Sequence, residues 1–198
     1  MIDLTEKQIR DTLDSFDKNV SLYSNKVEWD TSVSKTFNTK VLQPFLLYIN
    51  QYSDAKKPVI GFMGCGTGRN MFLAMLSGSY KCIGYDFSKK MLEEGRKRVP
   101  DGEFVEFDIT NDSFEDDYFD GIMAESVLNY IKRAELKSVL QNFYTSLKPG
   151  GIALIGSKVD GNNLYTDTFL GDPRYYISYP VDYIKDHQKL HEFAMEVF

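Results

Sequence analysis

The sequence predicts an α/β fold: a doubly wound, mostly parallel sheet covered by helices, with a helical cap before it. First, short apolar runs alternate with helical periodicity from Pro58 onwards, which is typical of a parallel sheet. Second, Gly64, Gly66 and Gly68 join the first apolar run to a helix. Third, the next strands each stop at a carboxylate. These observations together predict a ligand site at the strand ends.

The order of elements follows from the same patterns. We expect strands at residues 58–63, 80–86, 103–107, 118–124 and 152–156. We expect helices at residues 5–16, 35–50, 69–76 and 89–99, and a further helix that ends near residue 147. Ser88 is a suitable N-cap for the helix at 89–99, and Pro100 ends that helix. A turn at residues 148–151 leads into the last of these strands.

Composition excludes several classes of function. The chain has 198 residues, 42% hydrophobic and 26% charged, which suffices for one globular domain with its own core. Its net charge of −6 and pI near 5.0 disfavour nucleic acid as a partner, because that binding depends on neutralising phosphates. No leader sequence and no apolar run long enough to cross a bilayer is evident. We therefore expect a cytoplasmic protein without a membrane partner.

Cysteines and histidines give no sign of a metal site. Cys65 and Cys82 have neither disulfide-framework density nor C-x-x-C spacing, so both are expected to be reduced thiols. His187 and His191 lie four residues apart, but no further ligand pattern completes a site. We expect no metal.

The glycine loop indicates a small ligand that carries a carboxylate or phosphate. Glycines at alternate positions allow a sharp turn and a close approach of the backbone, and the following helix presents free N–H groups. An ordinary glycine-rich turn is the alternative. The dinucleotide fingerprint G-x-G-x-x-G is disfavoured, because Met71 stands where its last glycine would be.

Carboxylates at the strand ends point to a nucleoside ligand. Asp86, Asp108 and Glu125 follow the second, third and fourth strands, and open α/β sheets bind ligands at this edge. Asp86 stands eighteen residues beyond Gly68, a spacing suited to a carboxylate that accepts hydrogen bonds from ribose hydroxyls. The alternative for Asp86 is a helix-capping acid.

The chain resembles the class I S-adenosylmethionine-dependent methyltransferases of the small-molecule type. Five motifs occur in the family's order between Pro58 and Gly156. They are residues 64–68 (GCGTG), 84–92 (GYDFSKKML), 107–109 (FDI), 119–130 (FDGIMAESVLNY) and 147–151 (LKPGG). The resemblance therefore implies S-adenosylmethionine as the cofactor and a Rossmann-like methyltransferase fold.

The same resemblance implies which residues bind that cofactor. They are Gly64, Cys65, Gly66, Asp86, Phe87, Met91, Asp108, Ile109 and Glu125. Within this set, Asp86 would contact the ribose, Asp108 the adenine amino group, and the Ile109 backbone N–H the adenine ring. No residue identifies itself as a general base, so the catalytic residues stay unknown at this stage.

The sequence departs from the family pattern in two places. Phe62 stands where the family usually has an acid that helps to bind the cofactor's ammonium group, and we hypothesise that Glu125 takes over this role. The chain also ends after an expected helix at about 181–193 and a strand at 195–198, so one strand of the family sheet is expected to be missing. Either the chain is a fragment, or the exposed edge is covered, for example by a second copy in a homo-oligomer.

Residues 158–180 show no clear periodicity and are too long for a plain connection, so a lid or substrate segment is expected. Aromatic residues gather there. Together with residues elsewhere, the acceptor-pocket candidates are Tyr23, Trp29, Asn129, Tyr130, Arg174, Tyr175, Tyr176 and Tyr179. The alternative for the aromatic residues is packing in the core.

These inferences divide the chain into a helical cap (1–57), a cofactor-binding core (58–157), the lid segment (158–180) and a C-terminal helix and strand (181–198). The expected function is methyl transfer to a small-molecule acceptor by in-line displacement, which needs positioning more than chemistry from the protein. Two alternatives stay open: a non-catalytic module that binds S-adenosylmethionine or S-adenosylhomocysteine, and aminopropyl transfer from the decarboxylated cofactor.

Overall fold

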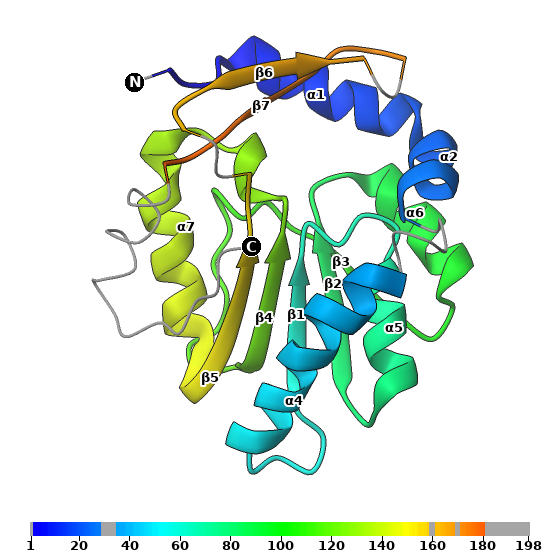
Figure 1. Ribbon diagram of the computed structural model, residues 1–198, viewed down its shortest axis with the longest axis vertical. Coiled ribbons are helices and arrows are strands. Elements are labelled where there is room, and N and C mark those ends of the chain that lie inside the picture. The colour runs from blue at the N-terminus through cyan, green and yellow to red at the C-terminus, as the bar shows by residue number, and fades with distance from the viewer. Residues whose placement is uncertain (1, 29–34, 159–160, 169–170, 181–198) are drawn as a thin grey trace.

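A computed structural model describes residues 2–28, 35–158, 161–168 and 171–180. Its centre is a sheet of five parallel strands in the order β3–β2–β1–β4–β5 (Figure 1). The strands are β1 (Val59–Met63), β2 (Lys81–Asp86), β3 (Glu103–Glu106), β4 (Phe119–Glu125) and β5 (Leu147–Gly156). The strand order reverses at β1, which pairs with both β2 and β4. The carboxyl ends of these strands therefore form the switch point where open α/β sheets bind ligands.

Helices cover both faces of this sheet, which confirms the doubly wound fold. One face packs against α4 (Gln43–Tyr52), α5 (Arg69–Ser77) and α6 (Lys89–Arg98), and the other against α7 (Arg133–Ser146). Successive strand residues point to opposite faces. In β1, accordingly, Ile60 and Phe62 join the cluster with α4, α5 and α6, whereas Met63 joins the cluster with α7.

Strand β5 begins earlier than the sequence indicates. Leu147 already pairs with Phe119, after which the register shifts and Gly121 pairs with Ile152. Residues 148–151, expected as a turn before the strand, are therefore an irregularity within it. Gly150 has a φ of 80° there, which explains the glycine in this motif.

The helices before β1 lie in two different places. Helix α1 (Glu6–Lys18) and the short α2 (Val20–Tyr23) lie across the carboxyl ends of the strands, whereas α4 packs on a sheet face (Figure 1). Two π-helical turns, η1 (Ser24–Glu28) and η2 (Asn38–Leu42), lie between them. Helix α1 begins with a capping box in which Thr5 and Gln8 satisfy each other's backbone N–H groups.

The segment after β5 contains regular structure that periodicity does not reveal. Strands β6 (Leu164–Asp167) and β7 (Arg174–Ile177) form an antiparallel hairpin. This hairpin lies beside α1 above the carboxyl ends of the sheet (Figure 1). The fold therefore places a layer made from both ends of the described chain over the expected site.

Several expectations fall outside the described residues: the acceptor candidate Trp29, the pair His187 and His191, and the helix and strand within 181–198. The covering of the β5 edge by a second copy stays a prediction. Among the described residues, no helix is long and apolar enough to span a membrane, and no group of three metal-ligating side chains occurs.

Candidate functional site

The glycine loop connects β1 to α5 through three residues with positive φ. The φ angles are 62° at Gly64, 56° at Gly66 and 87° at Gly68, values that favour glycine. The loop is also tightly packed, because a Cβ atom on Gly64 would lie 2.7 Å from Val127 Cγ2. Cys65 N–H donates to the Tyr85 carbonyl at 3.0 Å, which ties the loop to β2. Backbone shape rather than side chains thus defines this part of the site.

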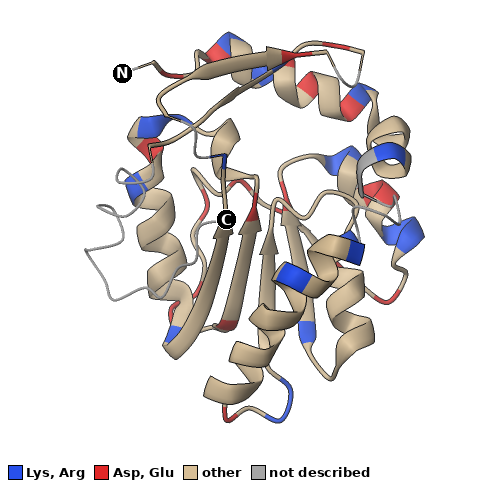
Figure 2. Cartoon of the chain, viewed as in Figure 1, with Lys and Arg blue, Asp and Glu red and all other residues tan. Residues whose placement is uncertain are grey.

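Asp86 links the end of β2 to the glycine loop. Its carboxylate accepts hydrogen bonds from Gly66 N–H at 2.8 Å and from Ser88 N–H at 2.9 Å. Burial raises the pKa of Asp86, although these backbone hydrogen bonds oppose the shift, and the nearby Asp17 adds to it. Figure 2 shows acidic positions gathered near the carboxyl ends of the central strands. The two predicted cofactor motifs therefore meet at Asp86.

Asp108 closes a turn after β3. Its carboxylate accepts hydrogen bonds from Thr110 N–H at 2.9 Å and from Asn111 Nδ2 at 2.7 Å. Burial would raise the pKa of Asp108, but the hydrogen bonds from Thr110 and Asn111 outweigh burial and lower it. Ile109 beside it is 9% exposed and packs in the core. The contact of Asp108 with adenine stays a prediction. The hydrogen bonds from Thr110 and Asn111 fix the position of its carboxylate.

Phe87 and Met91 have contrasting environments after β2. Phe87 is 50% exposed, an unusual setting for a large apolar side chain and one that suits contact with a ligand. Met91 is buried at 3% exposure, and its N–H donates to Ser88 Oγ at the start of α6. The predicted contact of Met91 with the cofactor stays a prediction, and its side chain lies in the core.

Glu125 lies on the same face of the sheet as Phe62, the residue that stands where the family usually has an acid. Phe62 is buried at 2% exposure among apolar side chains and pairs across the sheet with Met123. Because strand residues alternate in direction, Glu125 points to the same face as Met123. The following Ser126 has a φ of 60°, a strained value of the kind that clusters at functional sites. The hypothesis that Glu125 replaces the acid is therefore geometrically consistent.

Aromatic rings from α1, α2, the segment after β4 and both strands of the hairpin meet at the carboxyl ends of the sheet. Phe16 contacts Tyr23 and Tyr130 edge-on, with ring centroids 5.4 and 5.5 Å apart. Tyr176 contacts Tyr130 at 6.2 Å and stacks on Tyr165 at 5.3 Å. Burial raises the pKa of the Tyr130 phenol to about 12, so this group is neutral near pH 7. These five residues form what we call the aromatic cluster.

Two cationic side chains border the aromatic cluster. Arg174 forms a bidentate pair with Asp167 at 2.9 and 2.8 Å, and its guanidinium lies 5.5 Å from the Phe16 ring. Lys158 Nζ lies 3.7 Å from the centroid of Tyr165. Of the acceptor candidates, Tyr23, Tyr130, Tyr176 and Arg174 are thus brought together.

Three other acceptor candidates have structural contacts instead. Asn129 donates to the Ile177 carbonyl at 2.6 Å and accepts from Lys158 N–H at 3.1 Å. Tyr179 is fully buried, and its hydroxyl donates to the Leu128 carbonyl at 2.9 Å. Tyr175 is held through its backbone by Thr12 at 2.8 Å. Because the side-chain polar groups of Asn129 and Tyr179 are engaged within the protein, we expect these two residues to support the pocket rather than to contact a ligand. A ligand contact of the Tyr175 side chain stays a prediction.

Comparison with known sequences shows which proteins this chain resembles. Residues 62–151 match the sequence model of the methyltransferase-domain family. The chain is 34% identical over 96 residues to demethylmenaquinone methyltransferase of Clavibacter sepedonicus, which covers 47% of this chain and 38% of the relative. It is 29% identical over 109 residues to carboxy-S-adenosyl-L-methionine synthase of Helicobacter pylori, which covers 52% of this chain and 44% of the relative. The matched segments thus span less than half of either relative.

The fold of this chain also matches solved methyltransferase structures. An S-adenosylmethionine-dependent methyltransferase from Leishmania major superposes with a TM-score of 0.71 at 13% identity, over 92% of this chain and 72% of that protein. Residues 62–151 thus match a methyltransferase domain, within a fold that solved methyltransferases share. S-adenosylmethionine is the cofactor of this family, as the motifs of the sequence imply.

The residues of this methyltransferase domain fit S-adenosylmethionine. The Asp86 carboxylate offers about four positions for accepting hydrogen bonds, and the bonds from backbone N–H groups do not occupy all of them. A hydroxyl donor there would also stabilise the charge that burial disfavours. The left-handed glycines themselves carry no side chain at the same edge. The structure therefore provides an acceptor for ribose beside the backbone of the glycine loop.

Sequence reasoning missed several N-terminal residues that lie at this site. Ser24 and the glycine-loop residue Thr67 are fully buried, and their hydroxyls lie 3.1 Å apart. Asp17 accepts a hydrogen bond from Ser88 Oγ. Phe16 stands at the centre of the aromatic cluster. No motif marks these N-terminal residues, because their roles depend on where α1 lies rather than on local sequence.

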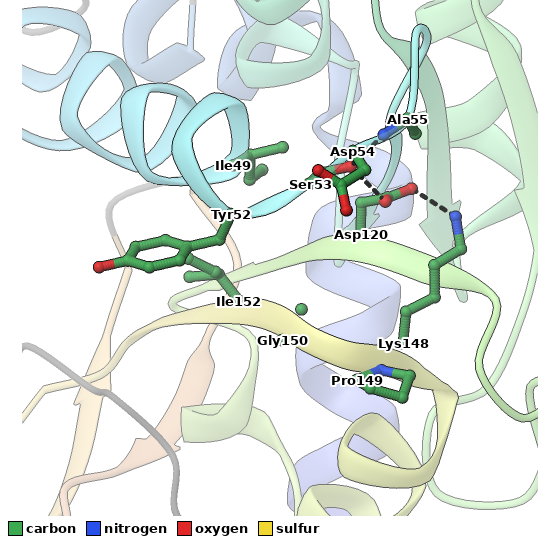
Figure 3. Close-up of a pocket in the computed structure, with 11 residues that line it drawn as sticks. Ile49, Tyr52, Ser53, Asp54, Ala55, Asp120, Lys148, Pro149, Gly150 and Ile152 are labelled. Carbon is green, nitrogen blue, oxygen red and sulfur yellow. Dashed lines mark hydrogen bonds and ion pairs between the residues drawn. The ribbon is translucent and has the colours of Figure 1, made fainter.

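A pocket of about 350 Å³ opens at the opposite edge of the methyltransferase domain (Figure 3). Asp120 on its wall accepts hydrogen bonds from Ser53 at 2.6 Å and from Lys148 at 2.7 Å. Tyr52 and the bulge at Gly150 also line it. This pocket lies at the start of β4 and β5, away from Asp86 and Glu125, so we do not assign the cofactor to it.

Proposed function

We propose that the chain transfers a methyl group from S-adenosylmethionine to a small-molecule acceptor. The observation that carries the proposal is the hydrogen bond between Gly66 N–H and the Asp86 carboxylate. This hydrogen bond joins the glycine loop to Asp86, the proposed ribose-binding carboxylate, at the carboxyl ends of adjacent strands. The aromatic cluster lies on the same side of the sheet.

Eight of the nine predicted cofactor-binding residues have a proposed role, and the ninth, Met91, is buried at 3% exposure. When bound, the cofactor supplies an activated methyl group on a sulfonium. Asp86 accepts hydrogen bonds from the ribose, Asp108 and Ile109 hold the adenine, and Glu125 pairs with the ammonium group. Gly64, Cys65 and Gly66 form the loop against which the ligand lies, and Phe87 offers an exposed apolar surface beside it.

The aromatic cluster is proposed as the acceptor side of the site. Its rings exclude water, which favours a reaction in which charge disappears from the donor. Tyr130 is a neutral hydrogen-bonding group there near pH 7, since burial raises its pKa to about 12. A small acceptor fits this placement better than a polyanion, because the chain carries a net charge of −6.

A mass-spectrometric assay tests the proposal. The protein would be incubated with S-adenosylmethionine and a panel of small phenols, amines, thiols and quinone-like compounds. We expect S-adenosylhomocysteine to form in equal amounts with an acceptor in which a methyl group has replaced a hydrogen, the proton being released to solvent. Tyr130→Phe serves as a matched variant that keeps the ring, and Asp86→Ala as one that loses the cofactor contact. Turnover that Asp86→Ala leaves unchanged would contradict the assignment of the site.

Phe62 favours one second candidate, a module that binds the cofactor without turnover, because the usual acid is absent from its place. Tight binding of S-adenosylmethionine with no product across the panel would support it. One relative is named for synthesis of carboxy-S-adenosyl-L-methionine. If S-adenosylmethionine gained mass instead of losing its methyl group, the result would favour synthesis of a carboxylated cofactor over methyl transfer.

A further inference from the structure

Helix α1 and the β6–β7 hairpin are joined as one unit. Thr12 Oγ1 accepts a hydrogen bond from Tyr175 N–H at 2.8 Å and lies 3.2 Å from the Tyr175 carbonyl oxygen. Ser15 Oγ donates to the Asp172 carbonyl at 3.1 Å, and Asn19 Nδ2 donates to the Asp172 carboxylate at 3.0 Å. An isolated two-stranded hairpin is only marginally stable. Helix α1 therefore covers the second edge of β7 and completes the layer seen at the top of Figure 1.

One side of this unit is fixed firmly to the body of the domain at Arg133. The buried Arg133 donates from Nε to the Ile2 carbonyl at 2.7 Å and from Nη2 to the Ser178 carbonyl at 2.6 Å. Its N–H donates to the Asp3 carboxylate at 3.0 Å. The start of α1 and the end of the hairpin thus converge on one residue at the beginning of α7.

The other side rests on the cofactor loops through a few side-chain contacts. Asp17, near the end of α1, accepts a hydrogen bond from Ser88 Oγ, and Ser88 N–H donates to Asp86. Ser24 lies 3.1 Å from Thr67, which belongs to the glycine loop. Both contacts involve residues next to groups that we assign to the cofactor.

We propose that α1, the short α2 that continues it to Ser24, and the hairpin form a single lid that pivots near Arg133 and is latched over the cofactor by Asp17 and Ser24. The inference rests on the proposed function, because the ligand that the lid retains is S-adenosylmethionine or its product. Asp17 acts as a positioning residue: it holds Ser88, and through Ser88 the loop that carries Asp86. Release of the cofactor then requires the latch to open while the pivot stays in place.

The rate at which S-adenosylhomocysteine dissociates from the full chain tests the latch, measured by stopped-flow displacement. Asp17→Ala should accelerate release about tenfold, the factor that corresponds to losing one hydrogen bond to a charged group. Asp17→Asn keeps an oxygen acceptor for Ser88 and should restore most of the retention. Asp14→Ala removes an exposed carboxylate from the same helix and should leave release unchanged. Equal release rates for all three variants and the wild type would overturn the latch.

Hydrogen exchange tests the single lid independently of any ligand. Loss of the latch should lower the stability of the lid against local unfolding as one unit. In Asp17→Ala, amides of residues 6–18 and 174–177 should therefore exchange faster by similar factors, whereas those of β1 and β4 should not change. Faster exchange in α1 alone would show that the hairpin does not move with it and would overturn the lid. If the wild type bound no S-adenosylhomocysteine, the proposed function would fail, and exchange would still decide whether the lid exists.

Discussion

At the residue scale, Asp86 serves the protein and the predicted ligand at once. Its carboxylate orders the glycine loop through Gly66 and begins α6 through Ser88. Helix-capping and ribose binding were alternatives for this acid in the sequence. The contacts show that the carboxylate can do both, since its backbone partners leave acceptor capacity for a ligand.

Replacing Asp86 by alanine should weaken S-adenosylhomocysteine binding at least tenfold, because a hydrogen bond to a charged group contributes about 1.5–3 kcal/mol. Adenosine binding should weaken similarly, since the lost contact is to the ribose. Calorimetric titration with both ligands checks this. Glu106→Ala is the control, because Glu106 is an exposed carboxylate on β3 that forms an ion pair with the exposed Lys89, at 3.4 Å. Unchanged binding in Asp86→Ala would mean that the ribose lies elsewhere.

Glu125 provides a second test at this scale. If it binds the ammonium group, Glu125→Gln should weaken S-adenosylmethionine binding about tenfold through loss of a charged contact. The variant should bind 5′-methylthioadenosine as the wild type does, because that compound lacks the amino-acid part. Equal affinities of wild type and variant for both compounds would show that Glu125 does not take over the role of the acid that is missing at position 62.

At the element scale, the turn after β1 depends on close contact with the segment after β4. Gly64→Ala should lower the free energy of unfolding by more than about 1–2 kcal/mol, the cost of a left-handed residue with a Cβ atom, because Val127 also lies in the way. Gly150→Ala is the matched control: its φ is 80°, but its Cβ would meet nothing within 4 Å. Urea unfolding measures both. A smaller loss for Gly64→Ala than for Gly150→Ala would contradict the packing.

The network around Asp120 ties the start of β4 to β1 and β5. Burial would raise the pKa of Asp120, but hydrogen bonds from Lys148, Ser53 and Val59 N–H together lower it. A lowered carboxyl pKa stabilises the fold above the unfolded value of 3.8, and this contribution is lost as pH falls through the folded value.

Asp120→Asn should therefore destabilise the protein by roughly 1–3 kcal/mol at pH 7. The difference from wild type should shrink as pH falls below about 5. Unfolding curves across this range measure it. Glu103→Gln removes an exposed partner of Lys81 at 3.9 Å and should have little effect at any of these pH values. A pH-independent difference for Asp120→Asn would show that its charge is not involved.

At the scale of the whole molecule, the sequence predicted the sheet better than the layer above it. The five central strands and their terminal carboxylates follow from local apolar runs and motif spacing. The hairpin does not, because its four-residue strands depend on contacts such as Thr12 with Tyr175, which lie 163 positions apart. Tyr179 illustrates a further limit: aromatic residues suit both a pocket and a core, and only the fold shows that this one is buried.

The central claim is that this domain binds S-adenosylmethionine at the carboxyl ends of β1, β2 and β4. Calorimetric titration of the purified chain with S-adenosylmethionine, and separately with S-adenosylhomocysteine, tests it most directly. We predict saturable binding of both, with dissociation constants on the order of micromolar, near −8 kcal/mol. A folded sample that binds neither ligand would contradict the claim.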